Sequence, residues 1–179
     1  MATLKLIKQD LNYLKDRFNV SFVSAILTNR GFHAVLLYRI SHSLFHKRIP
    51  IIPLVLTRIV QITYAIDIDF KATLHGGIII IHGVGLVIGQ GAVIHERCIL
   101  YHGVTLGRRK QIVELTNDDG FPTVGADCVL GAGCKIIGKV NVGHNSLIGP
   151  NVVLTHDAPI NSIVKCHEPL ITVKTTKTL

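Results

Sequence analysis

The sequence has few aromatic side chains, only 6% of its 179 residues, and no tryptophan. Acidic side chains are also scarce: there are 11 Asp and Glu against 19 Lys and Arg, which gives a formal net charge of +8. A charge of this sign predicts anionic partners. Nucleic acid is disfavoured among them, because the sequence has neither a basic helix nor an aromatic platform for bases. Coenzyme phosphates or an acidic sugar polymer would account for the same charge.

No C-x-x-C spacing occurs among the cysteines, which disfavours a zinc ribbon or a redox pair. We interpret them as reduced thiols that serve as small apolar residues in a cytoplasmic protein, namely Cys98, Cys128, Cys134 and Cys166. A secretory signal is not expected either, because residues 1–10 contain lysines and no apolar segment.

A long uninterrupted apolar segment is also missing. The nearest to one is residues 49–66, which Pro50, Pro53 and Arg58 interrupt. These residues disfavour a membrane-spanning helix, although peripheral contact with a membrane surface stays open.

What the sequence does contain is a six-residue repeat between residues 66 and 154. One aliphatic residue recurs in each hexad: Ile68, Leu74, Ile80, Leu86, Ile88, Ile94, Leu100, Leu106, Val124, Leu130, Ile136, Val142, Ile148 and Leu154. This period fits neither an amphipathic helix nor an alternating strand. It is typical of a parallel β-helix, in which each hexad forms one side of a three-sided coil, and it disfavours an ordinary β-sandwich. We expect the corners to use positive-φ residues, supplied by Gly89, Gly107, Gly125, Gly131, Gly143, Gly149, Asn145 and Asn151.

The repeat predicts which side chains stack on successive rungs. His82 and His102 are each the third residue of a hexad, so the two imidazoles are expected to lie in one column. Ala132 falls in the same column. Asp67 and Asp69 open the coil, and either carboxylate could orient His82 as a histidine base. His75, His95, His144 and His156 are interpreted as surface residues.

The sequence divides into three parts. Residues 1–64 lack the hexad and predict a helical cap, with apolar residues three or four apart and Gly31 as a helix stop. Residues 65–158 form the β-helix, and 159–179 a C-terminal tail. Residues 107–123 break the repeat and predict an extruded loop, basic at its start and acidic at its end, that could cover a bound acceptor. Overall we expect a mainly β protein with a short N-terminal α-helical cap.

Several motifs together resemble the hexapeptide-repeat acyltransferases, and within them the serine acetyltransferase branch. The resemblance covers residues 30–155 and rests on Gly31–Ala34 with Tyr38–Ile40, Asp67–Ile68, His82–Gly83, Gly103–Gly107 and Leu130–Ile136. It implies a homotrimer of left-handed coils that transfers acetyl from acetyl-CoA at sites between subunits, with no metal.

The resemblance also implies roles for single residues. His82 matches the general base, and Asp67 matches the aspartate paired with it. The coenzyme-binding rungs match at Gly107, Ala132, Lys135 and Pro150, although the family usually has alanine at the last of these positions.

The sequence departs from the branch where the amino-acid acceptor binds. Gly120 and Phe121 stand where the family has arginine and histidine, and Ile81 replaces the aspartate before His82. The remaining pattern is similar to the colanic-acid type of O-acetyltransferase. It favours acetylation of a sugar hydroxyl in a bacterial capsule or exopolysaccharide, as polymer or repeat unit, with the saccharide acceptor bound by His102, Arg108 and Arg109. The alternatives are a serine O-acetyltransferase of cysteine biosynthesis and a non-catalytic β-helix scaffold.

Overall fold

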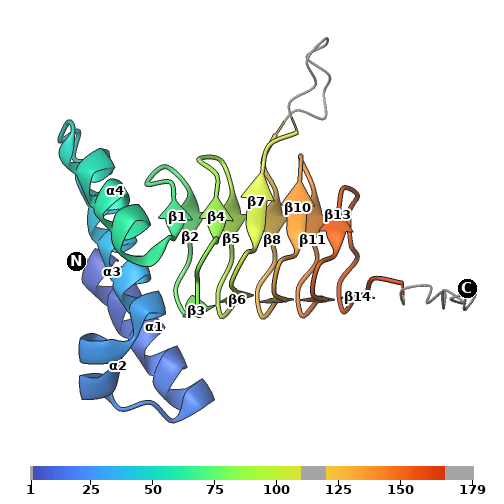
Figure 1. The fold of residues 1–179 in the computed structure, drawn as a ribbon, viewed down its shortest axis with the longest axis horizontal. Coiled ribbons are helices and arrows are strands. Elements are labelled where there is room, and N and C mark those ends of the chain that lie inside the picture. The colour runs from blue at the N-terminus through green and yellow to red at the C-terminus, as the bar shows by residue number, and fades with distance from the viewer. Residues whose placement is uncertain (1, 110–119, 168–179) are drawn as a thin grey trace, which may run out of the picture.

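Four helices and a three-sided parallel coil make up the computed structural model, which describes residues 2–109 and 120–167. The helices are α1 (Ala2–Phe18), α2 (Phe22–Thr28), α3 (Arg30–His46) and α4 (Ile52–Tyr64). They gather at one end of the coil, and the described chain leaves from the other end (Figure 1). This arrangement confirms the predicted mainly β fold with an N-terminal helical region.

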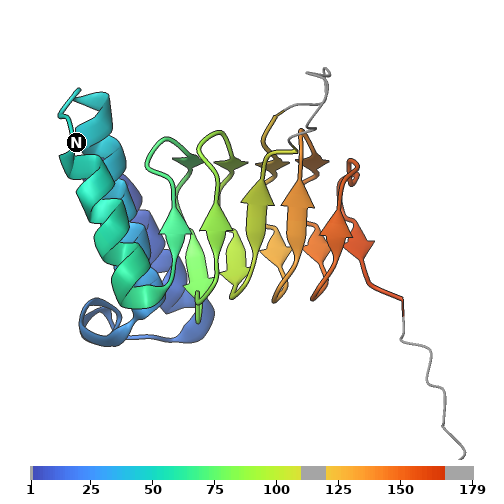
Figure 2. The same ribbon diagram turned by 45° about the horizontal axis from the view of Figure 1, so that its top comes forward.

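The strands are short and form three parallel sheets, one for each side of the coil, which Figure 2 shows from a second direction. Sheet A contains β1 (Asp67–Ile68), β4 (Val87–Ile88), β7 (Thr105–Gly107), β10 (Lys135–Ile137) and β13 (Val153–Leu154). Sheet B contains β2 (Thr73–Leu74), β5 (Val93–Ile94), β8 (Thr123–Val124) and β11 (Asn141–Val142). Sheet C contains β3 (Ile79–Ile81), β6 (Ile99–Tyr101), β9 (Val129–Leu130), β12 (Leu147–Ile148) and β14 (Ile163–Val164).

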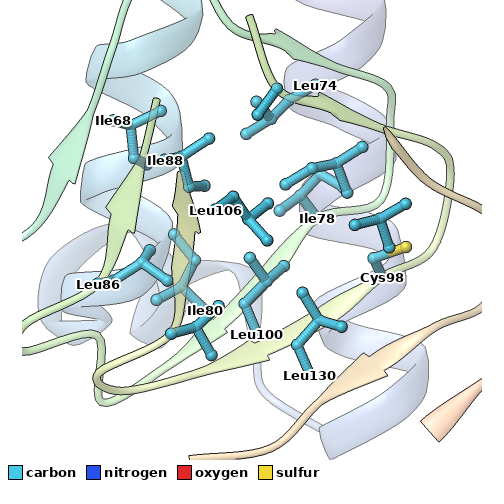
Figure 3. Packing of buried hydrophobic residues seen from close by; sticks show 14 of the residues in the cluster. Ile68, Leu74, Ile78, Ile80, Leu86, Ile88, Cys98, Leu100, Leu106 and Leu130 are labelled. Carbon is cyan, nitrogen blue, oxygen red and sulfur yellow. The ribbon is translucent and has the colours of Figure 1, made fainter. Parts of the chain in front are cut away.

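The repeated aliphatic residues fill the inside of the coil (Figure 3). All of those predicted from the hexad are buried except Leu154, which is partly exposed in the last rung. Equivalent residues lie directly above one another, as Ile80, Leu100 and Leu130 do in sheet C. Backbone hydrogen bonds and stacked apolar side chains therefore hold each rung to the next.

The corners differ from the prediction. Asn145 and Asn151 have the expected positive φ, but none of the six glycines named for this role does. Those glycines are needed for space instead: a Cβ on Gly131 would lie 2.8 Å from the Ile148 oxygen, and one on Gly125 would lie 2.7 Å from the His144 nitrogen. Successive turns approach too closely at these points for a side chain.

Gly31 is also not a helix stop, contrary to the prediction. It lies in the first turn of α3, where an added Cβ would clash with the carbonyl oxygen of Ile80. The break between α2 and α3 is made by Asn29, whose side chain caps α3 by accepting a hydrogen bond from the Phe32 amide at 2.8 Å. The glycine lets α3 pack directly on the first rung of sheet C.

A buried ion pair joins the cap to the coil. Asp10 of α1 and Arg39 of α3 are 1% and 2% exposed, and their closest atoms lie 3.0 Å apart. Asp10 also accepts hydrogen bonds from the amides of Gly77 and Ile78, at 2.8 and 2.9 Å. Arg39 donates to the carbonyl oxygens of Leu74 and His75. Burial raises the pKa of Asp10, an effect that the bonds to Arg39 and to the two amides oppose.

Three of the four cysteines, Cys98, Cys128 and Cys134, are buried free thiols, whereas Cys166 is exposed. Burial raises the pKa of Cys134 to about 12, as expected for a thiol that serves as an apolar residue. Among residues 2–109 and 120–167, no helix is long and apolar enough to cross a membrane. Most of the predicted loop 107–123 and the end of the predicted tail lie outside the described residues.

Candidate active site

The two histidines predicted to stack do lie on successive rungs. Sheet C pairs Ile80 with Leu100, so His82 and His102, each two residues further on, occupy the same corner between sheets C and A. Their ring centroids are 6.0 Å apart in an edge-to-face arrangement, and both side chains are exposed. The pairing continues through Leu130 and Ile148, which puts Ala132 and Pro150 on the next two rungs. We call His82, His102, Ala132 and Pro150 the His82 corner.

The backbone presents His82 outward. Its φ is +63° and that of Gly83 is +75°, so the chain turns sharply here. An added Cβ on Gly83 would clash with the side chain of Ile66, so this turn is packed tightly against the core. A left-handed non-glycine residue carries a strain cost, which the surrounding rungs impose. His82 is thus fixed in position on the coil rather than carried on a mobile loop.

Asp67 does not contact His82 in the single chain. Its carboxylate instead accepts a hydrogen bond at 3.2 Å from Gln61 at the end of α4. Asp67 begins β1 and is paired with Val87, beyond the turn that follows His82. Its role as the partner of His82 stays a prediction.

A cavity of about 290 Å³ opens beside His82. Its walls come from the cap and from the outer face of the first rung: Leu14, Phe18, Thr28, Asn29, Arg30, Gly31 and Ile79–Ile81. His82 is the imidazole that lines it, and Arg30 is the cationic side chain. This cavity could not be predicted from the sequence, because it depends on how the helices dock on the coil.

The predicted acceptor-binding arginines lie elsewhere on the chain. Arg108 and Arg109 follow β7 and are exposed, so a whole side of the coil separates them from His102. Arg109 lines a second cavity of about 350 Å³ with Lys139, Thr155, His156 and Asp157. One chain therefore does not bring these arginines to His82.

The predicted coenzyme residues are divided between two places. Ala132 and Pro150 belong to the His82 corner, and Lys135 reaches back toward it, with its Nζ 3.2 Å from the Gly133 carbonyl oxygen. Gly107 is the last residue of β7, at the end of the strand away from the His82 corner, and it pairs with Ile137. An added Cβ on Gly107 would lie 3.2 Å from the Ile137 side chain, so this glycine also has a packing role.

Comparison with known proteins first defines the class. The family model described as bacterial transferase hexapeptide (six repeats) matches residues 121–156. Together with the coil and the His82 corner, this match places the chain among the hexapeptide-repeat transferases and confirms the left-handed β-helix.

The relatives define the particular family. The chain is 36% identical to the serine acetyltransferase of Helicobacter pylori over 137 residues, which cover 76% of this chain and 78% of that protein. It is 34% identical to the serine acetyltransferase of Synechococcus elongatus over 142 residues, 79% of this chain and 57% of the relative. The chain belongs to the serine acetyltransferase family.

A solved structure agrees with this assignment. The serine acetyltransferase of Brucella abortus strain S19, in complex with coenzyme A, superposes with a TM-score of 0.80 at 29% identity, over 89% of this chain and 63% of that one. The chain therefore spans less than two thirds of both the Synechococcus and the Brucella proteins.

These relatives correct the predicted acceptor. The prediction of a capsule or exopolysaccharide O-acetyltransferase is wrong, because the relatives are serine acetyltransferases. It depended on Gly120 and Phe121, which stand where the family has the arginine and histidine that bind an amino-acid acceptor. In the structure the Phe121 ring packs on the corner of the coil at Gly89 and Gly91 and against the core, so it has a packing role.

Proposed function

We propose that this chain transfers an acetyl group from acetyl-CoA to the hydroxyl of L-serine. The observation that carries the proposal is the His82 corner, with two exposed imidazoles held on adjacent rungs, in a chain that covers 78% of a serine acetyltransferase. Serine is a small acceptor, and the cavity of about 290 Å³ beside His82 is of a size to admit it.

His82 acts as the general base in this proposal. Its imidazole takes the proton from the serine hydroxyl, and the resulting alkoxide attacks the thioester carbonyl carbon. The tetrahedral intermediate then collapses, the carbon–sulfur bond breaks, and the imidazolium returns the proton to the departing coenzyme thiolate. No acyl-enzyme is needed. His102, 6.0 Å from His82 between ring centroids, contacts the acceptor or the thioester.

The coenzyme lies along the continuation of the His82 corner. Ala132 and Pro150 are small on these rungs and leave the corner open to a long thioester arm. Lys135, with its ammonium group near this corner, supplies positive charge for the phosphates. The Brucella relative in complex with coenzyme A supports this choice of acetyl donor.

The single chain holds only part of the proposed site, which fits active sites that lie between the subunits of a homotrimer. His82 is exposed on an outer corner, while Asp67 bonds to Gln61, and Arg108 and Arg109 follow β7 at the other end of that side of the coil. A neighbouring subunit packed on this corner would complete the site, and the hydrogen bond between Gln61 and Asp67 would give way to one with His82.

The test is acetyl transfer by the purified chain with acetyl-CoA and L-serine, followed by release of the coenzyme thiol and by mass spectrometry of O-acetylserine. His82→Ala is expected to lower kcat by about 10²- to 10⁴-fold, the usual contribution of a general base. The matched control is His46→Ala, an exposed histidine at the end of α3.

D-Serine and L-threonine are tried as acceptors in the same assay, to test whether the chain selects L-serine. Turnover on L-serine that disappears in His82→Ala and persists in His46→Ala is the expected result. Equal turnover by the His82 variant would remove that residue as the base. Absence of acetylserine with the unaltered chain would overturn serine as the acceptor.

A further inference from the structure

A second histidine pair lies on another corner of the coil, between sheets B and C. Sheet B pairs Leu74 with Ile94, so His75 and His95, each the next residue, stand on adjacent rungs. Their rings are stacked, with centroids 4.8 Å apart and planes 17° apart. Glu96 follows His95 on the same corner. We call His75, His95 and Glu96 the His75 corner.

The donor atoms of this corner converge. The Glu96 carboxylate lies beside both rings: one oxygen is 3.3 Å from His75 Nδ1 and the other is 4.0 Å from His95 Nδ1. One donor atom from each of the three side chains lies within 4.8 Å of the others. The side chains are between 35% and 44% exposed, so they can adjust and a small ion can reach them from solvent.

This donor set has the chemistry of a transition-metal site. Two imidazoles and one carboxylate are ligands that zinc takes in proteins, and a water molecule commonly fills the fourth position. Tetrahedral bonds of about 2.1 Å separate donor atoms by roughly 3.4 Å, so the present cluster needs only a small contraction.

The neighbouring charges permit a cation here. Arg97 is the adjacent cationic residue, and Asp127 pairs with it through two hydrogen bonds of 2.7 and 2.6 Å, which offsets its charge. The next histidine on this face, His144, has its ring centroid 6.2 Å from that of His95. Its Nδ1 already accepts a hydrogen bond from the Ala126 amide at 2.9 Å, which leaves the proton on Nε2 and removes this ring as a ready ligand.

We propose that His75, His95 and Glu96 bind one divalent transition-metal ion, with zinc as the best match to the donors. The ion joins two successive rungs of the coil and strengthens the first turns, next to the cap. It lies on a different corner from His82 and takes no part in acetyl transfer. The inference does not rest on the proposed function.

The experiment titrates zinc into the chelator-treated, desalted protein and measures the number of ions bound per chain by calorimetry. Thermal unfolding is followed with and without the ion. The test variants are Glu96→Gln and the double variant His75→Ala with His95→Ala. The matched control is His42→Ala with His46→Ala, another pair with ring nitrogens 3.1 Å apart.

The unaltered chain and the control are expected to bind one more zinc ion per chain than the His75 and His95 double variant. An ion at about 100 times its Kd should raise the midpoint of unfolding by about 5 °C, and this shift should vanish in the double variant. Glu96→Gln, which keeps the shape of the corner, should weaken binding at least about tenfold.

The proposal is overturned if the double variant keeps the full number of zinc ions and the full thermal shift. It is equally overturned if the control variant alone loses them. Acetyl transfer is measured separately, so failure of serine acetylation leaves this result unaffected.

Discussion

The contacts that stabilise the coil differ in kind from the contacts that hold the helical cap on it. In the coil every rung repeats the same backbone ladder and the same buried aliphatic positions, so its stability is shared among many equivalent contacts. The cap has no repeat: an apolar cluster that includes Phe32 and Ile79 and one buried ion pair, Asp10 with Arg39, hold it to the coil. Asp10 also accepts from the amides of Gly77 and Ile78. A repeat therefore spreads the effect of damage over neighbouring rungs, whereas each contact between the cap and the coil occurs once and has no equivalent to share its loss.

The largest effect is expected from Asp10→Ala. This change removes the carboxylate that pairs with the buried Arg39 guanidinium and that accepts from the amides of Gly77 and Ile78, and should cost about 3–5 kcal/mol. Hydrogen exchange should show lost protection in α1 and α3 with little change in the distal rungs. Asp16→Ala, at an exposed position of the same helix, is the control. Equal loss throughout the coil would show that cap and coil are one cooperative unit.

Leu100→Ala tests whether the stability of the coil is shared among its rungs. Leu100 is fully buried in the middle of the coil, and its truncation should cost about 2–5 kcal/mol in urea unfolding. Protection should fall in the rungs on both sides of it. Val153→Ala, at a position 65% exposed, should change stability by less than about 0.5 kcal/mol. A loss confined to the Leu100 rung would contradict the shared stability of the repeat.

Asn29→Ala tests a smaller contribution to the stability of the helical region, the N-cap of α3. The Asn29 side chain accepts from the Phe32 amide at 2.8 Å at the start of α3, and its loss should cost about 1 kcal/mol. Asn12→Ala, at an exposed position inside α1, serves as the comparison in the same denaturation series. Equal stability of Asn29→Ala and the unaltered chain would mean that the Asn29 N-cap contributes nothing to the free energy of unfolding.

The smallest effect concerns His42, which bonds through Nδ1 to the Phe70 carbonyl oxygen at 2.8 Å. Burial, and then the neighbouring His46, lower the pKa of His42 below 6.5. Folding therefore favours the neutral form of His42. The contribution of His42 to stability is complete above its pKa in the unfolded chain, and it is lost as the pH falls toward its lower pKa in the folded chain. The stability difference between the unaltered chain and His42→Gln should shrink between about pH 7 and pH 5. A constant difference would refute this.

The coil could be predicted from the sequence because its rule is local and periodic. Ile80, Leu100 and Leu130 follow the hexad, so the register of sheet C and the stacking of His82 on His102 follow as well. The spacing of His75 and His95 is also twenty residues, the same as that of His82 and His102. The two histidines are surface residues as predicted, and their spacing alone indicates that they stack.

The cap and the acceptor could not be predicted in the same way. Asp10 and Arg39 are 29 residues apart and belong to no repeat, so only the docked helices bring them together. Gly31 was taken for a stop because the contact it permits, with Ile80, is 49 residues away. Phe121 indicates from the sequence only the loss of an acceptor-binding histidine, because its packing on Gly89 and Gly91 depends on the shape of the corner.

The bond from Asp10 to the amides of Gly77 and Ile78 has a consequence for how the chain folds. These bonds span 67 and 68 residues, so α1 leaves the ribosome long before the amides that donate to its carboxylate have been synthesised. Contacts this far apart in sequence carry a large loop-closure cost and form late. The coil turn that contains Gly77 must therefore close first, and α1, which precedes this turn in the chain, is among the last elements to find its place.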